Sequence, residues 1–206
     1  MSNYLAIATV TMALRDILQD AALVAVPGTN VTVKRPENVS NDGQDKAGIN
    51  LFLYQAIPNP AWANNDLPTR SANGRLMQRP QVALDLYYLL SFHGSELAME
   101  PQRLLGSTVI TLHAQPLLVS NVIRNVIANY RYLSASDLAD QVELVKFGPL
   151  NLSLEELSKL WSVFFQVLYT LSAVYRASAV LIEAELPTQD VKIVTSRDIR
   201  VSPEVP

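Results

Sequence analysis

The basic residues of one long loop are the strongest candidates for recognition chemistry. Arg70, Arg75 and Arg79 lie within ten residues of one another, and Asp66 is the only acidic residue nearby. Arginine presents a planar fork of donors that suits carboxylates at an interface. Trp62 precedes them in the same loop and is a side-chain type that anchors protein contacts. We expect a contact surface for an acidic partner; the alternative is a solvated loop with Trp62 folded back on the domain.

Residues suited to catalysis are few. The chain has two histidines, His93 and His113, and no cysteine, and no third ligand type follows either histidine at metal-binding spacing. The nucleophile motif G-x-S-x-G and both glycine-rich phosphate-binding motifs are absent. Asp137 and Asp140 fit a polar turn better than a cation site. We expect no enzyme, no metal and no cofactor; a small hydrolase that uses a histidine is the weakest alternative.

The balance of charge and apolar residues narrows the function classes. Charged residues make up 17% of the 206, against roughly 25% in an ordinary domain, whereas apolar residues reach 49%. This composition argues against disorder, and the net charge of −3 argues against a protein that binds nucleic acid electrostatically. With so little charge to cover the surface, the simplest expectation is an obligate oligomer.

Membrane insertion and secretion are not expected. The longest uncharged windows, 104–123 and 47–65, are interrupted by proline, asparagine and other polar residues, so neither resembles a spanning helix. The first residues lack the basic region of a signal peptide. The sequence therefore predicts a protein that is made in the cytoplasm.

Periodicity predicts the elements that must position these residues. The expected fold is α/β (α+β mixed), with a mixed β-sheet of about four to five strands flanked by helices. Ser2 is the expected cap of the first helix, the S-x-x-E box at Ser153 is expected to cap the last one, and Gly148-Pro149 is expected to close a strand. The helices are expected over about 3–24, from Pro101 to Pro116, over about 117–128 and after Ser153; the strands over about 31–35, 49–55, 82–92, 141–147 and 169–183.

Two segments are expected to extend from the domain. Residues 58–79 form an irregular stretch longer than most loops, which favours a functional loop. We place the domain at 1–186 and an extended C-terminal arm at 187–206. Val191, Ile193 and Val194 form a β-prone patch in this arm, and we expect that patch to add a strand to the sheet edge of a partner.

Several motifs occur in an order and spacing that resemble one family. They are Asn50-Leu-Phe-Leu-Tyr-Gln55, Pro58-Asn-Pro60, Asp66-Leu-Pro-Thr-Arg70, Arg79-Pro-Gln81, Leu84-Asp-Leu-Tyr-Tyr-Leu-Leu90, Glu100-Pro-Gln-Arg-Leu-Leu-Gly106, Asp137-Leu-Ala-Asp140 and Leu152-Ser-Leu-Glu-Glu-Leu-Ser-Lys-Leu-Trp161. Over about residues 2–185 the chain resembles the amino-terminal domain of tail-terminator, or cap, proteins. These belong to extracellular contractile injection systems of the Photorhabdus virulence cassette and antifeeding-prophage type.

The resemblance implies a structural role. Proteins of this kind are similar in fold to phage tail terminators and form a hexameric ring that caps the inner tube and joins the sheath to it. The implied partners are further copies of the chain, the inner-tube protein and the sheath protein, with no nucleic acid and no membrane. The implied location is a particle released from the cell. The alternative is another tail-completion, connector or baseplate adaptor protein of the same kind of particle.

Overall fold

The computed structural model describes residues 2–36, 46–65, 80–141, 144–164 and 167–184. Its helices are α1 (Ala6–Ala25), α3 (Glu100–Ala114), α4 (Ser120–Asn129) and α5 (Leu154–Ser162), with short 3-10 helices η2 (Pro60–Asn65), η3 (Arg131–Leu133) and η4 (Leu138–Asp140). Its strands are β1 (Asn30–Thr32), β2 (Gly48–Pro58), β3 (Gln81–His93), β4 (Leu117–Leu118), β5 (Val145–Leu150) and β6 (Ser172–Glu183).

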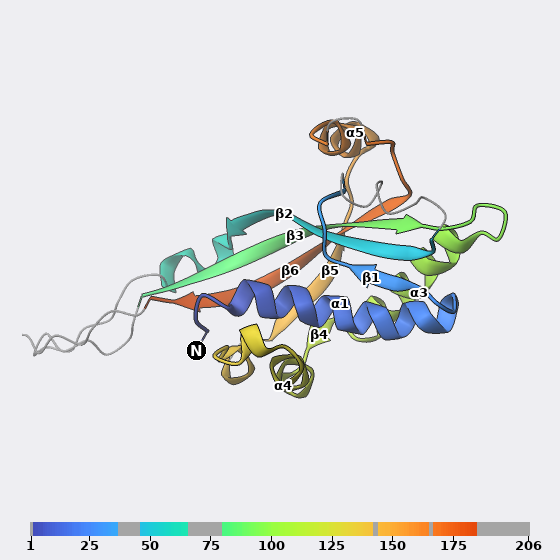
Figure 1. Ribbon diagram of the computed structural model, residues 1–206. Coiled ribbons are helices and arrows are strands. Elements are labelled where there is room, and N and C mark those ends of the chain that lie inside the picture. The colour runs from blue at the N-terminus through green and yellow to red at the C-terminus, as the bar shows by residue number, and fades with distance from the viewer. Residues whose placement is uncertain (1, 37–45, 66–79, 142–143, 165–166, 185–206) are drawn as a thin grey trace, which may run out of the picture.

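The strands form one mixed sheet in the order β1-β2-β3-β6-β5-β4 (Figure 1). Only β1 and β2 run parallel, and every other neighbouring pair is antiparallel. The predicted mixed sheet flanked by helices is confirmed, with six strands in place of four to five. The additional strand is β4, whose two residues fall within the helix predicted over about 117–128, because so short a strand has no periodic signal.

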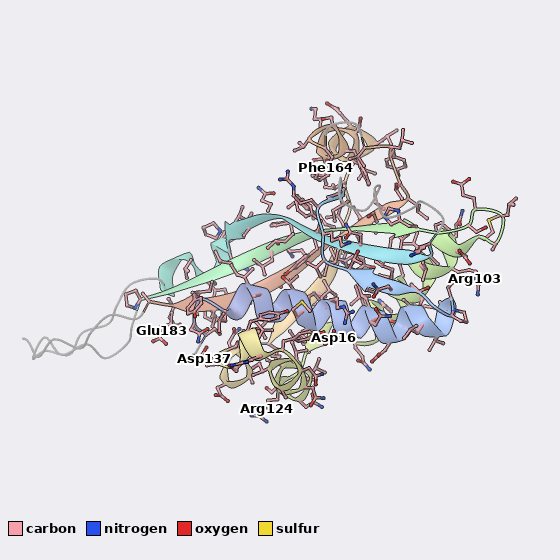
Figure 2. All side chains as sticks on the ribbon, in the orientation of Figure 1. Asp16, Arg103, Arg124, Asp137, Phe164 and Glu183 are labelled. Atoms are coloured by element: carbon pink, nitrogen blue, oxygen red, sulfur yellow. The ribbon has the colours of Figure 1, made fainter. Side chains whose placement is uncertain are left out.

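The main core lies between one face of the sheet and the helices α1, α3 and α4 (Figure 1). Buried apolar residues of α1 recur at helical spacing, as at Val10, Leu14 and Leu18. The opposite face carries α5, and Phe164, labelled in Figure 2, lies between that helix and the sheet. The sheet is therefore covered fully on one side and in part on the other.

The alternation predicted for β3 is confirmed. Leu86, Tyr88, Leu90 and Phe92 all point into the main core, whereas Leu89 points to the opposite face and packs with α5. Period-two alternation places successive side chains on opposite faces. Strand β3 therefore contributes buried residues to the apolar cluster on each face of the sheet.

The strand predicted over about 169–183 is present as β6, but its side chains do not alternate regularly to the end. Leu84 pairs with Val180 and Leu86 with Ala177, so two residues of β6 stand opposite one of β3. Ala179 is the extra residue and has a φ of 64°, which makes this a β-bulge. Beyond the bulge Val180 enters the main core, where unbroken alternation from Ala177 would place Ala179.

Helix α1 does not begin as expected. Leu5 is its N-cap residue and makes no side-chain cap bond, while Ser2 is buried and donates its hydroxyl to Gln141 Oε1 at 2.9 Å. Asn3 takes the local role, because its Oδ1 accepts the backbone N–H of Leu5 at 2.9 Å. Ser2 was the wrong cap because its partner lies far away in the sequence.

The predicted boundary of one other element needs correction. Gly148 and Pro149 lie inside β5, and Pro149 stands opposite Tyr175 of β6. On α3, Thr108 is buried, whereas the neighbouring Val109 is 45% exposed. The capping box at Ser153 is confirmed, with the N–H of Glu156 bonded to Ser153 Oγ at 3.2 Å.

Within the described ranges, none of the helices combines the length and the apolar character that crossing a bilayer requires.

Candidate interaction surfaces

Trp62 is the one predicted contact residue within the described part of the chain. It lies half-buried in η2, and its backbone N–H donates to the carbonyl of Asn59 at 3.2 Å. Asn59 ties this turn to β3, because its N–H donates to the carbonyl of Ala83 at 2.8 Å and its Nδ2 to Asp85 Oδ1 at 2.8 Å. The start of the long loop is thus anchored firmly to the sheet.

The other predicted contact residues lie outside the described residues. They are Arg70, Arg75 and Arg79 of the loop and Val191, Ile193 and Val194 of the arm. Their proposed contacts remain predictions.

Asp85 is a buried carboxylate that the sequence did not single out. It is 3% exposed, and besides the bond from Asn59 its Oδ2 lies 3.7 Å from Arg176 Nη1. It stands opposite the bulge at Ala179, so the chain places an acidic residue where the ladder between β3 and β6 is locally interrupted. Its position as a polar residue within the alternating strand was the available signal.

Side chains of α1 close the outer edge of β1. Gln19 Oε1 accepts the N–H of Val31 at 2.8 Å, and Gln19 Nε2 donates to the carbonyl of Thr29 at 2.9 Å. Arg15 Nε donates to the carbonyl of Val31 at 3.1 Å. Both outward backbone groups of Val31 are therefore occupied, and this edge cannot accept another strand without displacing them.

The end of β6 is closed in a similar way. Beyond Ser178 this strand no longer pairs with β5, and Gln141 takes that place. Its Nε2 donates to the carbonyl of Ala179 at 2.9 Å, and its Oε1 accepts the N–H of Leu181 at 3.3 Å. The N–H of Glu183 then donates to the carbonyl of Ser2 at 2.8 Å.

Proline blocks the free part of β5. The N–H of Phe147 points toward β4 and donates to the carbonyl of Pro116 at 2.7 Å. Residues two apart point the same way, so the nitrogen of Pro149 also faces this edge, where it has no hydrogen to donate. The structure therefore places Pro149 where a strand would otherwise be able to join.

The outer edge of β2 remains open. Strand β1 pairs with it only from Gly48 to Asn50, and no other described strand lies beyond it (Figure 1). Residues 51–58 of this edge contain no charged side chain, and Gln55, Ala56 and Pro58 are exposed. Their outward N–H and C=O groups are a template for a further strand.

An open groove of about 780 Å³ lies among α1, α3 and α4. At its wall Tyr130 donates to Asp16 Oδ1 at 2.8 Å, and Arg15 Nη1 donates to the same oxygen at 2.8 Å. Partial burial, together with the hydrogen bond to Asp16 and the charge of that group, raises the pKa of Tyr130. The phenol is thereby kept protonated as a structural donor.

Apolar side chains are exposed at two further places. Leu154, Val163, Leu168 and Tyr169 surround α5, each more than half exposed, at 82%, 71%, 73% and 60%. Leu97, at 101%, lies on the loop between β3 and α3. Exposed apolar groups of this kind mark contact sites when they gather in one region, as they do around α5.

The two histidines lie on different elements, His93 at the end of β3 and His113 on α3. His93 Nε2 lies 3.0 Å from Ser91 Oγ, and burial lowers the pKa of His93. His113 is exposed in the last turn of α3. Among the residues that the structure describes, no group of three or more His, Cys, Asp or Glu side chains is arranged to hold a metal ion.

Comparisons with known proteins identify relatives in fold. Residues 9–196 match the family model of the Pvc16 N-terminal domain. The sheath/tube terminator of the extracellular contractile injection system PVC, in its extended state, is similar in structure with a TM-score of 0.60 and 16% identity. The match covers 95% of this chain and 64% of that one.

A second solved structure gives a similar result. The tube-terminating cap of the anti-feeding prophage matches with a TM-score of 0.60 and 16% identity, over 93% of this chain and 60% of that one. This chain thus spans less than two thirds of the length of either solved relative. No curated protein matches the sequence.

Proposed function

The chain belongs to the Pvc16 N-terminal domain family, and on that premise we propose that it is a tail terminator of a phage-tail-like contractile injection particle. In this role it forms a ring on the last layer of the inner tube, ends tube growth and joins the sheath to the tube. It acts by occupying surfaces, without chemistry.

The observation that carries this proposal is the agreement in fold. The similarity extends over 95% of this chain, and the solved relative is itself a sheath/tube terminator. The motifs of the sequence that resemble cap proteins support the same conclusion, because they fall on β2, β3, α3, η4 and α5, as well as on the long loop.

The surfaces of the domain suit a ring subunit. A ring joins two different patches of neighbouring copies, so each subunit needs at least two complementary surfaces. The open edge of β2 and the apolar groups around α5 are two candidate surfaces, and they adjoin at Phe52, whose ring centroid lies 5.5 Å from that of Phe164. We propose six copies per ring, with tube and sheath proteins as the other partners, assembly in the cytoplasm and release with the particle.

Electron microscopy of particles made without this protein tests the proposal. We expect tubes of irregular length and sheaths that separate from them, because nothing then closes the last tube ring. Restoring the gene for this chain should restore uniform length. Particles of normal, uniform length with stable sheaths in its absence would overturn the proposed function.

A further inference from the structure

The edges of the sheet differ in whether they can accept another strand. Gln19 and Arg15 occupy the edge of β1, Gln141 and Ser2 occupy the end of β6, and Pro149 blocks β5. The outermost strand β4 has only two residues. Among the described strands, residues 51–58 of β2 are the one long edge left without such protection.

This edge is built to receive an apolar strand. On one face of the sheet Leu53 packs against the main core, and on the opposite face Phe52 and Tyr54 pack against the cluster under α5. A strand added beside them would therefore find apolar neighbours on both faces. Isolated proteins protect long uncharged edges with charge, proline, a bulge or a covering segment. Residues 51–57 of β2 contain neither charge nor proline, and no described strand covers them; the edge is interrupted only by a bulge between Leu53 and Gln55.

We propose that residues 190–195 of a neighbouring copy of this chain add as a strand to the open edge of β2. Val191 and Ile193 alternate with Lys192, and Val194 offers an apolar side chain to the opposite face. Residues 51–58 of the edge carry no charge that would oppose Lys192. The family match continues through residue 196, so it includes this segment.

The course of the chain favours a donor in another copy. Gln81 pairs with Glu183 and Leu84 with Pro58, so β6 leaves the sheet at the same end as β2. At that end Asn59, between β2 and η2, is bonded to β3, and both β3 and β2 separate β6 from the outer edge of β2 in the same copy. A strand given to the next copy joins two different surfaces, as ring closure requires.

Engineered cysteines test this inference, which rests on the proposed ring. The chain has no cysteine of its own, so any disulfide must come from the introduced pair. Gln55→Cys is combined in turn with Val191→Cys, Lys192→Cys, Ile193→Cys and Val194→Cys, and assembled particles are oxidised. Neighbouring strands bring side chains of the same face close enough for a disulfide.

We expect covalent oligomers at alternate positions of the series, because successive side chains of a strand point to opposite faces. Leu97→Cys, exposed on the loop after β3 at the end of the sheet away from Gln55, replaces Gln55→Cys in the control and should give no such product. Disulfides only within one chain, equal yields at all four positions, or no disulfide would overturn the inference.

A proline variant separates this inference from the proposed function. Ile193→Pro removes an N–H from the donated strand, and Ile199→Pro is the matched control outside it. We expect Ile193→Pro to reduce incorporation into particles at least tenfold while Tm stays that of the control. Normal incorporation of Ile193→Pro would overturn the donated strand, whereas the deletion experiment above would still test the terminator role.

Discussion

Gln19 shows how one side chain can occupy two backbone groups at a sheet edge. It bonds the N–H of Val31 and the carbonyl of Thr29 through opposite ends of its amide. Gln19→Ala leaves both groups without their protein partner, so we expect a loss of about 1–3 kcal/mol in the free energy of unfolding. Asp20→Ala, one residue along and exposed, is the control.

Urea denaturation of the two variants checks this prediction. The Asp20→Ala variant should unfold within about 0.5 kcal/mol of the natural chain, as most surface substitutions do. If Gln19→Ala is equally mild, the amide does not protect the edge as described.

His93 gives the fold a dependence on pH. Burial lowers its pKa below the ordinary value of 6.5, so the unfolded chain binds a proton more readily than the folded chain. Stability is therefore full above about pH 6.5 and declines as the pH falls below it, because protonation favours the unfolded state.

Thermal unfolding of His93→Gln and His113→Gln between about pH 5 and pH 7.5 measures this effect. We expect the loss of Tm toward low pH to shrink in His93→Gln and to persist in His113→Gln, whose histidine is exposed. Identical slopes in the natural chain and His93→Gln would contradict the assignment.

At the level of elements, the bulge in β6 carries local strain. Ala179 has a φ of 64°, a conformation that glycine adopts without the steric cost of a Cβ. We expect Ala179→Gly to raise the free energy of unfolding by about 0.5–1 kcal/mol, because the relief of strain exceeds the entropic cost of glycine.

Ala177→Gly is the matched substitution on the same strand. Ala177 is fully buried in the main core, so the same change there should lower stability by about 1 kcal/mol. We expect calorimetry to show a higher Tm than the natural chain for Ala179→Gly and a lower Tm for Ala177→Gly. A fall in Tm for both would show that the bulge is not strained at Ala179.

The elements that the sequence predicted well are those whose signals are local. The apolar residues of β3 alternate within one segment, and the capping box of α5 spans four residues, so both could be identified without the fold. The resemblance to cap proteins likewise depended on short motifs in a fixed order.

The features that the sequence did not predict depend on distant partners. Ser2 bonds Gln141, 139 residues away, and the bulge at Ala179 is defined only by its register against Leu84 and Leu86. The protected edges could not be predicted either, because the roles of Gln19 and Pro149 follow from the order of the strands.

At the level of the whole molecule, the low charge content has a partial structural explanation. Much of the apolar excess fills the core beneath α1 and the smaller cluster beneath α5. The remainder includes exposed side chains around α5 and the uncharged edge of β2. A domain with an unprotected edge and an apolar patch around α5 is better suited to assembly than to a monomeric state.

The position of the protein in the particle tests the central claim most directly. An affinity tag on the chain, detected with a gold-labelled binder by electron microscopy, locates it along intact particles. If the chain is a terminator, the label should appear only at the end opposite the baseplate. Label at the baseplate or along the sheath would contradict the account and favour an adaptor protein instead.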